Sequence, residues 1–101
     1  MTPGIDVDFP LEKIAELCRK YQVKELALFG SVARAEARSD SDVDVLVEFL
    51  PNARIGFEYA ALQRELAVLM GRPVDLASKR ALKSRVRETI LREARVLYAS
   101  G

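Results

Sequence analysis

The chain has 101 residues, of which half are hydrophobic, and its 16 basic and 15 acidic residues leave a net charge of +1. This composition is typical of a folded globular protein, and the length suits one domain spanning residues 1–101. The single cysteine excludes an internal disulfide, and the absence of histidine excludes histidine-based zinc sites, catalytic triads and a histidine general base. Aspartate chemistry with a hard cation such as magnesium remains open.

Features that are absent from the sequence indicate where the protein is located and which classes of partner it does not bind. No apolar run is long enough to cross a bilayer, and the first residues do not have the basic-then-apolar layout of a signal peptide. We therefore expect a cytoplasmic protein with no membrane association. The nearly neutral charge disfavours direct binding to nucleic acid.

Helical and extended patterns alternate along the chain. Residues 1–7 have no period and are predicted to form a loose leader, after which apolar residues recur at helical spacing up to Tyr21. Cys18 lies on that apolar stripe, which favours a packing role. Gln22 to Glu25 is predicted to connect to a strand over 26–29, with two helical turns over 31–37 and a second strand over 42–49.

The second half of the chain continues the alternation. Pro51 ends the second strand, a loop follows over 52–56, and the next helix ends at Gly71. A short strand over 74–76 precedes a last helix whose predicted apolar face is Leu82, Val86, Ile90, Ala94 and Leu97. This order predicts an α+β fold, a small mixed β-sheet covered by helices.

The second strand opens with two acids at alternating positions. In an extended chain Asp42 and Asp44 share one face, and the valines between them share the other. Two adjacent carboxylates repel each other, and a divalent cation between them would relieve that repulsion. The pair therefore predicts a metal site.

Gly30 and Ser31 end the first strand and supply the complementary feature. Glycine lets the backbone approach a ligand closely, and the amide groups of the following turn, together with the Ser31 hydroxyl, can hold phosphate oxygens. For both features to meet one ligand, the end of the first strand must lie beside the start of the second, which predicts an antiparallel pair.

Asp75 is a third acid, between Val74 and Leu76 in a short strand. It is either a third metal ligand, the acceptor of a proton from an attacking hydroxyl, or a solvated residue on an edge strand. Each short motif also has a plain interpretation, because Gly-Ser and Asp-Ser-Asp are common in polar turns. Their occurrence together favours a functional site.

The motif Gly-Ser-x-Ala-Arg over 30–34, followed by Ser-Asp-x-Asp over 41–44 at the start of an apolar strand, resembles the signature of the polymerase-beta-like nucleotidyltransferase superfamily. The small size and the run Leu-Phe-Gly-Ser-x-Ala-Arg resemble the minimal nucleotidyltransferases. Ala35 is a departure, since the family usually has glycine there. The resemblance covers nearly the whole chain, including the position of Asp75.

The resemblance implies a site and an activity. Gly30, Ser31 and Arg34 would bind the nucleotide, and Asp42, Asp44 and Asp75 would hold two magnesium ions, with manganese as an alternative. The expected reaction transfers a nucleoside monophosphate, AMP from ATP, to a hydroxyl. Similar minimal nucleotidyltransferases are antitoxins that adenylylate a tyrosine of a partner HEPN ribonuclease toxin.

Two other functions remain open at this point. An antitoxin could neutralise its partner by binding alone, or the chain could modify a small molecule in the manner of aminoglycoside nucleotidyltransferases. The basic residues after residue 78 are either a solvated helix face or a surface for nucleotide phosphates or an acidic partner. They are Lys79, Arg80, Lys83, Arg85, Arg87, Arg92 and Arg95.

Overall fold

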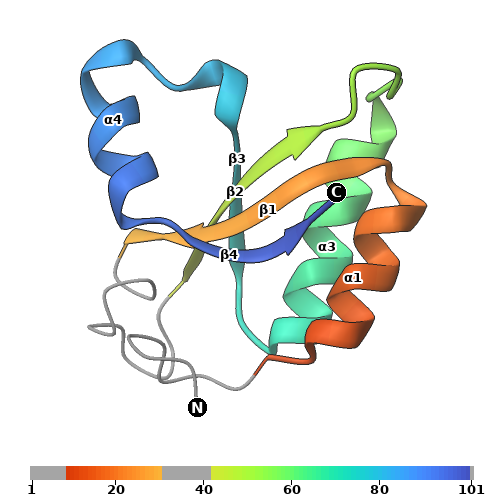
Figure 1. Ribbon diagram of the computed structural model, residues 1–101. Coiled ribbons are helices and arrows are strands. Elements are labelled where there is room, and N and C mark those ends of the chain that lie inside the picture. Colours follow the sequence, from red (N-terminus) through yellow and green to blue (C-terminus); the bar gives the residue numbers. More distant parts are fainter. Residues whose placement is uncertain (1–8, 31–41, 101) are drawn as a thin grey trace.

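A computed structural model describes residues 9–30 and 42–100 (Figure 1). The elements in chain order are α1 (Leu11–Lys20), β1 (Val23–Phe29), β2 (Val43–Phe49), α3 (Phe57–Met70), β3 (Val74–Ser78), the short 3-10 helix η1 (Lys79–Ala81), α4 (Ser84–Glu93) and β4 (Arg95–Ala99). The predicted α+β class, with a small mixed sheet and covering helices, is confirmed. The leader over 1–7 and the two turns over 31–37 lie outside the described residues.

The four strands form one sheet in the order β3-β2-β1-β4. The β1 strand is antiparallel to both β2 and β4, whereas β2 and β3 are parallel. Parallel neighbours need a crossover, and α3 provides it. In Figure 1, α1 and α3 lie side by side against the sheet, while α4 stands apart from them on its other side. Among the described helices, none has the length and apolar character needed to span a membrane.

The main core fills the space between the sheet and the α1 and α3 layer. Ile14, Leu17 and Cys18 lie on one face of α1 and are buried there. Burial raises the pKa of the Cys18 thiol to about 12, so the thiol stays protonated at neutral pH. Its predicted packing role is therefore confirmed. Leu62, Leu66 and Met70 supply the facing surface of α3.

The strand β2 shows why the sheet has two different faces. Val43, Val45 and Val47 have no exposed surface and point into the core, as the alternation predicted. Leu46 belongs to the opposite face, that of the aspartates, yet it is also buried, with 3% of its surface exposed. The aspartate face is therefore open at the end where β2 begins and closed further along.

A bridging lysine closes the far part of that face. The Lys79 Nζ lies 3.3 Å from a Glu48 carboxylate oxygen on β2 and 3.5 Å from a Glu25 oxygen on β1. The Lys79 side chain is mostly covered, with 21% exposed, so water screens these ion pairs less than fully exposed ones. The bridge fixes η1, and with it the end of β3, over the neighbouring strands.

Two boundaries differ from the sequence predictions. The first strand begins at Val23, inside the segment predicted to be a connection. The last helix ends at Glu93, and residues 95–99 form β4 instead of its final turn. The apolar period across 82–97 fits a helix locally, but pairing with β1 satisfies backbone groups that would otherwise line an open edge. Tertiary pairing therefore overrides the local pattern.

We expect Leu62→Ala to lower the free energy of unfolding by about 2–5 kcal/mol, because it leaves a cavity beneath the sheet. The matched control on the same helix is Val68→Ala, whose side chain is 81% exposed, and its effect should stay within about 0.5 kcal/mol. Urea unfolding curves measure both. Equal losses in the two variants would contradict this placement of the core.

Candidate active site

Three residues form one row across the sheet at the end where β2 begins. Phe29 of β1 lies opposite Asp44 of β2, and Asp44 lies opposite Asp75 of β3. Residues opposite each other on neighbouring strands point to the same face, and such strands are about 4.8 Å apart. The register therefore brings the Asp44 and Asp75 carboxylates side by side, on the face opposite the valines.

Asp42 precedes β2 by one residue and is exposed. The neighbouring Val43 N–H donates a hydrogen bond of 2.9 Å to the Pro73 carbonyl, which ties this end of β2 to the segment that leads into β3. Asp42 is thus held at the same edge of the sheet as Asp44 and Asp75. The three predicted acids come from two segments that are distant in sequence and adjacent in space.

Gly30 follows Phe29 directly and faces the same acid. Its φ of +73° lies in the left-handed region, which glycine adopts without strain. A methyl group added at Gly30 would collide with the Asp44 Oδ2 and lie 3.2 Å from its Cγ. This close approach confirms that the end of the first predicted strand lies beside the start of the second. It also explains on steric grounds why glycine suits position 30. Ser31 and Arg34 lie outside the described residues.

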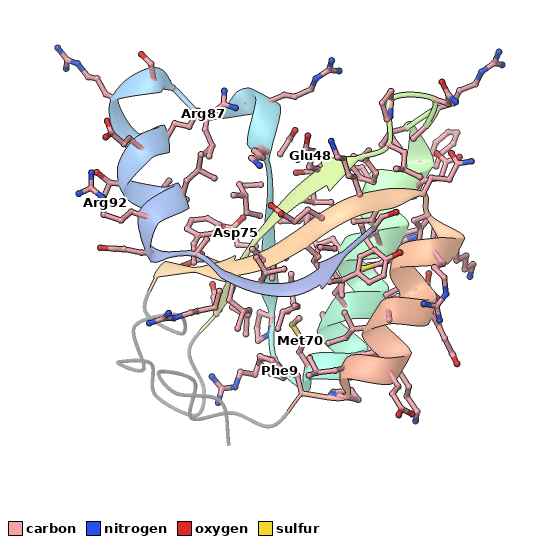
Figure 2. All side chains as sticks on the ribbon, viewed as in Figure 1. Phe9, Glu48, Met70, Asp75, Arg87 and Arg92 are labelled. Carbon is pink, nitrogen blue, oxygen red and sulfur yellow. The ribbon has the colours of Figure 1, made fainter. Side chains whose placement is uncertain are left out.

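The position of Asp75 is supported from beneath the sheet. Its neighbours Val74 and Leu76 are each only 6% exposed, so they anchor β3 while Asp75 itself reaches the solvent. The Tyr59 hydroxyl of α3 donates a hydrogen bond of 2.7 Å to the Leu76 carbonyl. Figure 2 shows Asp75 on the side of β3 nearer α4.

Tyr59 is a site-supporting residue that the sequence patterns did not single out. Burial and, to a lesser degree, the charge of Asp75 raise the pKa of the Tyr59 hydroxyl, so it remains a donor at neutral pH. Its ring also packs against Phe49, with centroids 6.3 Å apart. Helical spacing places Tyr59 on one face of α3 but carries no information about a bond to β3.

The donor chemistry of the row fits a magnesium ion shared with a nucleotide. Among residues 9–30 and 42–100, no group of three acidic or cysteine side chains is placed to hold a metal ion without other ligands. Magnesium in nucleotide sites usually takes one or two protein carboxylates and completes its octahedron with phosphate oxygens and water. Adjacent Asp44 and Asp75, with Asp42 at the same edge, match that requirement.

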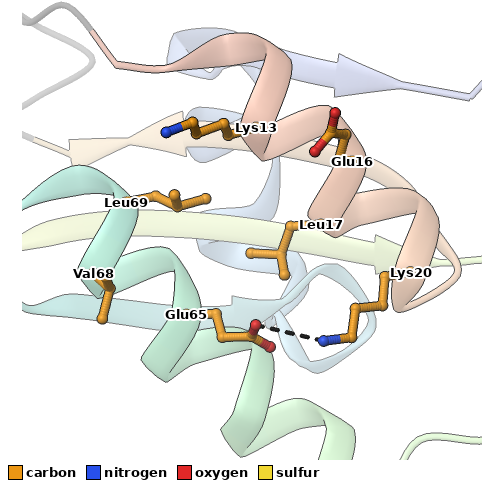
Figure 3. Close-up of a pocket in the computed structure, with 7 residues that line it drawn as sticks. All are labelled: Lys13, Glu16, Leu17, Lys20, Glu65, Val68 and Leu69. Atoms are coloured by element: carbon orange, nitrogen blue, oxygen red, sulfur yellow. Dashed lines mark ion pairs between the residues drawn. The ribbon is translucent and has the colours of Figure 1, made fainter.

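Two hollows of the described surface lie away from the aspartate row. One of about 410 Å³ lies between α1 and α3, where Lys20 and Glu65 form an ion pair of 3.5 Å (Figure 3). Another, of about 510 Å³, is bordered by Phe49, Tyr59 and Arg80 near the far end of β2. Asp75 of the aspartate row and Asp42 beside it are exposed in the described part of the chain, which suits a ligand that is held on one side and reacts on the other.

The profile of a known family matches residues 11–97, and its description is "Nucleotidyltransferase domain". The chain belongs to the nucleotidyltransferase domain family. It is 42% identical over 80 residues to the protein adenylyltransferase MntA of Thermococcus cleftensis, an alignment that covers 77% of this chain and 78% of that one. The predicted family and the prediction of an enzyme are thereby confirmed.

Solved structures agree with this assignment. One described as a candidate minimal nucleotidyltransferase is 42% identical, with a TM-score of 0.73 over 84% of this chain and 86% of that chain. A toxin–antitoxin complex with AMP-PNP has a TM-score of 0.72 at 22% identity, covering 90% of this chain and 74% of that one. The MNT antitoxin bound to a tri-AMPylated HEPN toxin from Shewanella oneidensis has a TM-score of 0.58 at 22% identity, covering 89% and 70%. These last two likenesses establish the shared fold.

Gly30→Ala and Gly71→Ala form a matched pair that tests the close approach to Asp44. Both glycines have positive φ, +73° and +68°, so each substitution should lower the free energy of unfolding by about 1–2 kcal/mol. Nothing lies within 4 Å of the added methyl at Gly71, whereas at Gly30 it meets the Asp44 carboxylate. We therefore expect only Gly30→Ala to lose nucleotide transfer beyond its loss of folded protein.

Nucleotide transfer and urea unfolding should be measured on the same preparations of these two variants. If Gly71→Ala loses as much activity per folded molecule as Gly30→Ala, contact with Asp44 is not what makes Gly30 necessary.

Proposed function

We propose that this protein is an antitoxin that transfers AMP from ATP to a tyrosine hydroxyl of a partner HEPN ribonuclease toxin. The proposal is supported by the similarity to a protein adenylyltransferase and by the shared fold with an MNT antitoxin whose HEPN partner is AMPylated. The donor is supported by the AMP-PNP complex of another structural neighbour. AMP transfer would inactivate the toxin covalently.

The observation that carries the proposal is the row made by Asp44, Asp75 and the start of the glycine turn. Nucleotidyl transfer needs a triphosphate held with its α-phosphorus exposed in line with an acceptor oxygen. Gly30 lies against one side of Asp44, and Asp75 lies on its other side. A triphosphate at the glycine turn and an acceptor near Asp75 would therefore meet across Asp44.

Each residue of the candidate site would have a separate role in the reaction. The acceptor oxygen attacks the α-phosphorus, a new phosphorus–oxygen bond forms, and pyrophosphate leaves with the electron pair of the bond that breaks. Gly30 and Ser31 would hold the leaving phosphates with Arg34 beside them, and Asp42 and Asp44 would hold magnesium. When bound, magnesium neutralises phosphate charge and stabilises the leaving group. Asp75, on the acceptor side, would hold a second ion or take the hydroxyl proton.

The exposure of the acids favours a protein acceptor over a small molecule. Asp42 and Asp75 are both exposed in the part of the chain that the structure describes. A small acceptor needs a pocket that covers most of its surface, whereas a protein segment is positioned by contacts beyond the reacting group. The acceptor is therefore best supplied on the surface of another protein.

We expect Asp42→Asn and Asp44→Asn each to abolish AMP transfer while leaving the fold intact, because asparagine keeps the shape and removes the metal-binding charge. Transfer of labelled AMP to a purified HEPN-type toxin, with circular dichroism as the folding control, is the measurement. Full activity in both variants would overturn the site. Toxin neutralisation that survives both substitutions would instead support an antitoxin acting by binding alone.

Magnesium should be required for ATP to stabilise the protein. A ligand that binds only the folded state raises the melting temperature by mass action, and carboxylates repel a triphosphate in the absence of the cation. Thermal unfolding with ATP should show the rise in magnesium or manganese and lose it in EDTA. The same rise in EDTA would contradict a phosphate site bridged by metal.

A further inference from the structure

The helix α4 differs from the described α-helices α1 and α3 because none of its residues is buried. Val86 is 48% exposed and Leu91 is 37% exposed, although a helix of ten residues is stable mainly through packing of an apolar face. In Figure 1 it stands apart from α1 and α3. Its apolar side is therefore only partly covered by the residues that the structure describes.

That side is a continuous stripe that also carries positive charge. One side of the helix is formed by the N-cap residue Lys83 and by Val86, Arg87, Ile90 and Leu91, each of which lies three or four residues from another member of the set. We call these five residues the α4 stripe. Ile90 is half-buried, whereas the other four are exposed. The stripe thus combines apolar groups at its centre with two cations.

The two cations of the α4 stripe have no acid partner among the residues that the structure describes, because the nearby acids are engaged elsewhere. Glu88 pairs with Arg92 at 3.3 Å, and Glu25 and Glu48 pair with Lys79. Lys79 and Arg92 are therefore not part of a free basic surface, contrary to the grouping by sequence. The uncompensated charge of Lys83 and Arg87 calls for an anionic partner.

The C-terminal end of α4 lies at the same end of the sheet as the aspartates. The helix leads directly into β4, where Arg95 lies opposite Leu28, the residue before Phe29 of the aspartate row. In Figure 2, Arg87 lies on the side of α4 toward η1, whereas Arg92 points the opposite way. A molecule bound along the stripe would therefore extend from the η1 side of α4 toward the end of the sheet that carries the aspartates.

From these observations we infer that the α4 stripe is the docking surface for the acceptor protein, recognising an acidic surface that has apolar residues at its centre. Phosphates of a nucleic acid would satisfy Lys83 and Arg87 but would leave Val86 and Leu91 uncovered, so a protein fits better. The inference rests on the proposed function for the identity of the acceptor, and it assigns the surface that holds it.

The helix itself offers a matched test, because Arg85 and Arg87 are both exposed and lie on opposite sides of α4. Arg87→Glu and Arg85→Glu change the net charge equally in the same helix. Each is combined with Asp42→Asn, which should prevent transfer, and binding to a purified HEPN-type toxin is measured without nucleotide at low and high salt. Leu91→Ala is the third variant.

We expect Arg87→Glu to weaken binding about tenfold or more, with a smaller effect at high salt, and Arg85→Glu to change it less than about threefold. Leu91→Ala should weaken binding at both salt concentrations. Stabilisation by magnesium and ATP, measured with the native Asp42, should be the same in all three variants. This last measurement separates docking from nucleotide binding.

Three results would overturn the docking surface. They are equal weakening by the two arginine variants, loss of magnesium–ATP stabilisation in Arg87→Glu with unchanged partner affinity, and Arg87-dependent binding of a single-stranded RNA without such binding of the partner. Failure of the proposed function would give a different result. If the native protein transfers no AMP but its binding to the partner depends on Arg87 and not on Arg85, the docking surface is supported and the transfer activity is not.

Discussion

The register of three strands is the constraint on which the rest of the molecule depends. Phe29, Asp44 and Asp75 lie in one row only because β1 runs antiparallel to β2 and β3 runs parallel to it at one particular alignment. A slip of one residue in β2 would turn Asp44 into the core and Val45 into solvent. The complete burial of Val43, Val45 and Val47 makes that slip costly, so the apolar face fixes the position of the polar one.

One face of the sheet contributes most of the stability, and the other face carries the candidate active site. Against α1 and α3 the packing is apolar and closed, and it carries the cooperative core. On the other face, Leu46 and the Lys79 bridge cover the part distant from the aspartates and leave the row itself accessible. The site can thus keep several like charges at an exposed edge, where water limits their repulsion, without weakening the core beneath.

Much of this arrangement could be predicted from the sequence because it depends on the spacing of residues that are close together in the chain. Alternation placed the valines opposite Asp44, Gly71 marked the end of α3, and the need for one ligand site predicted the antiparallel pair. The missed features depend on contacts between distant residues. The segment that forms β4 has an apolar spacing compatible with a helix, and neither the Tyr59 bond to Leu76 nor the Lys79 bridge leaves a local pattern.

The pairing of β1 with β4 has a consequence for the order in which the molecule can be assembled. The first strand is made early in synthesis, yet one of its two edges is unpaired until residues 95–99 have been made. Contacts that join such distant segments slow folding, and an unpaired edge can recruit strands from other chains. During translation, β4 is made after all three aspartates. The complete four-stranded sheet can therefore form only late in synthesis.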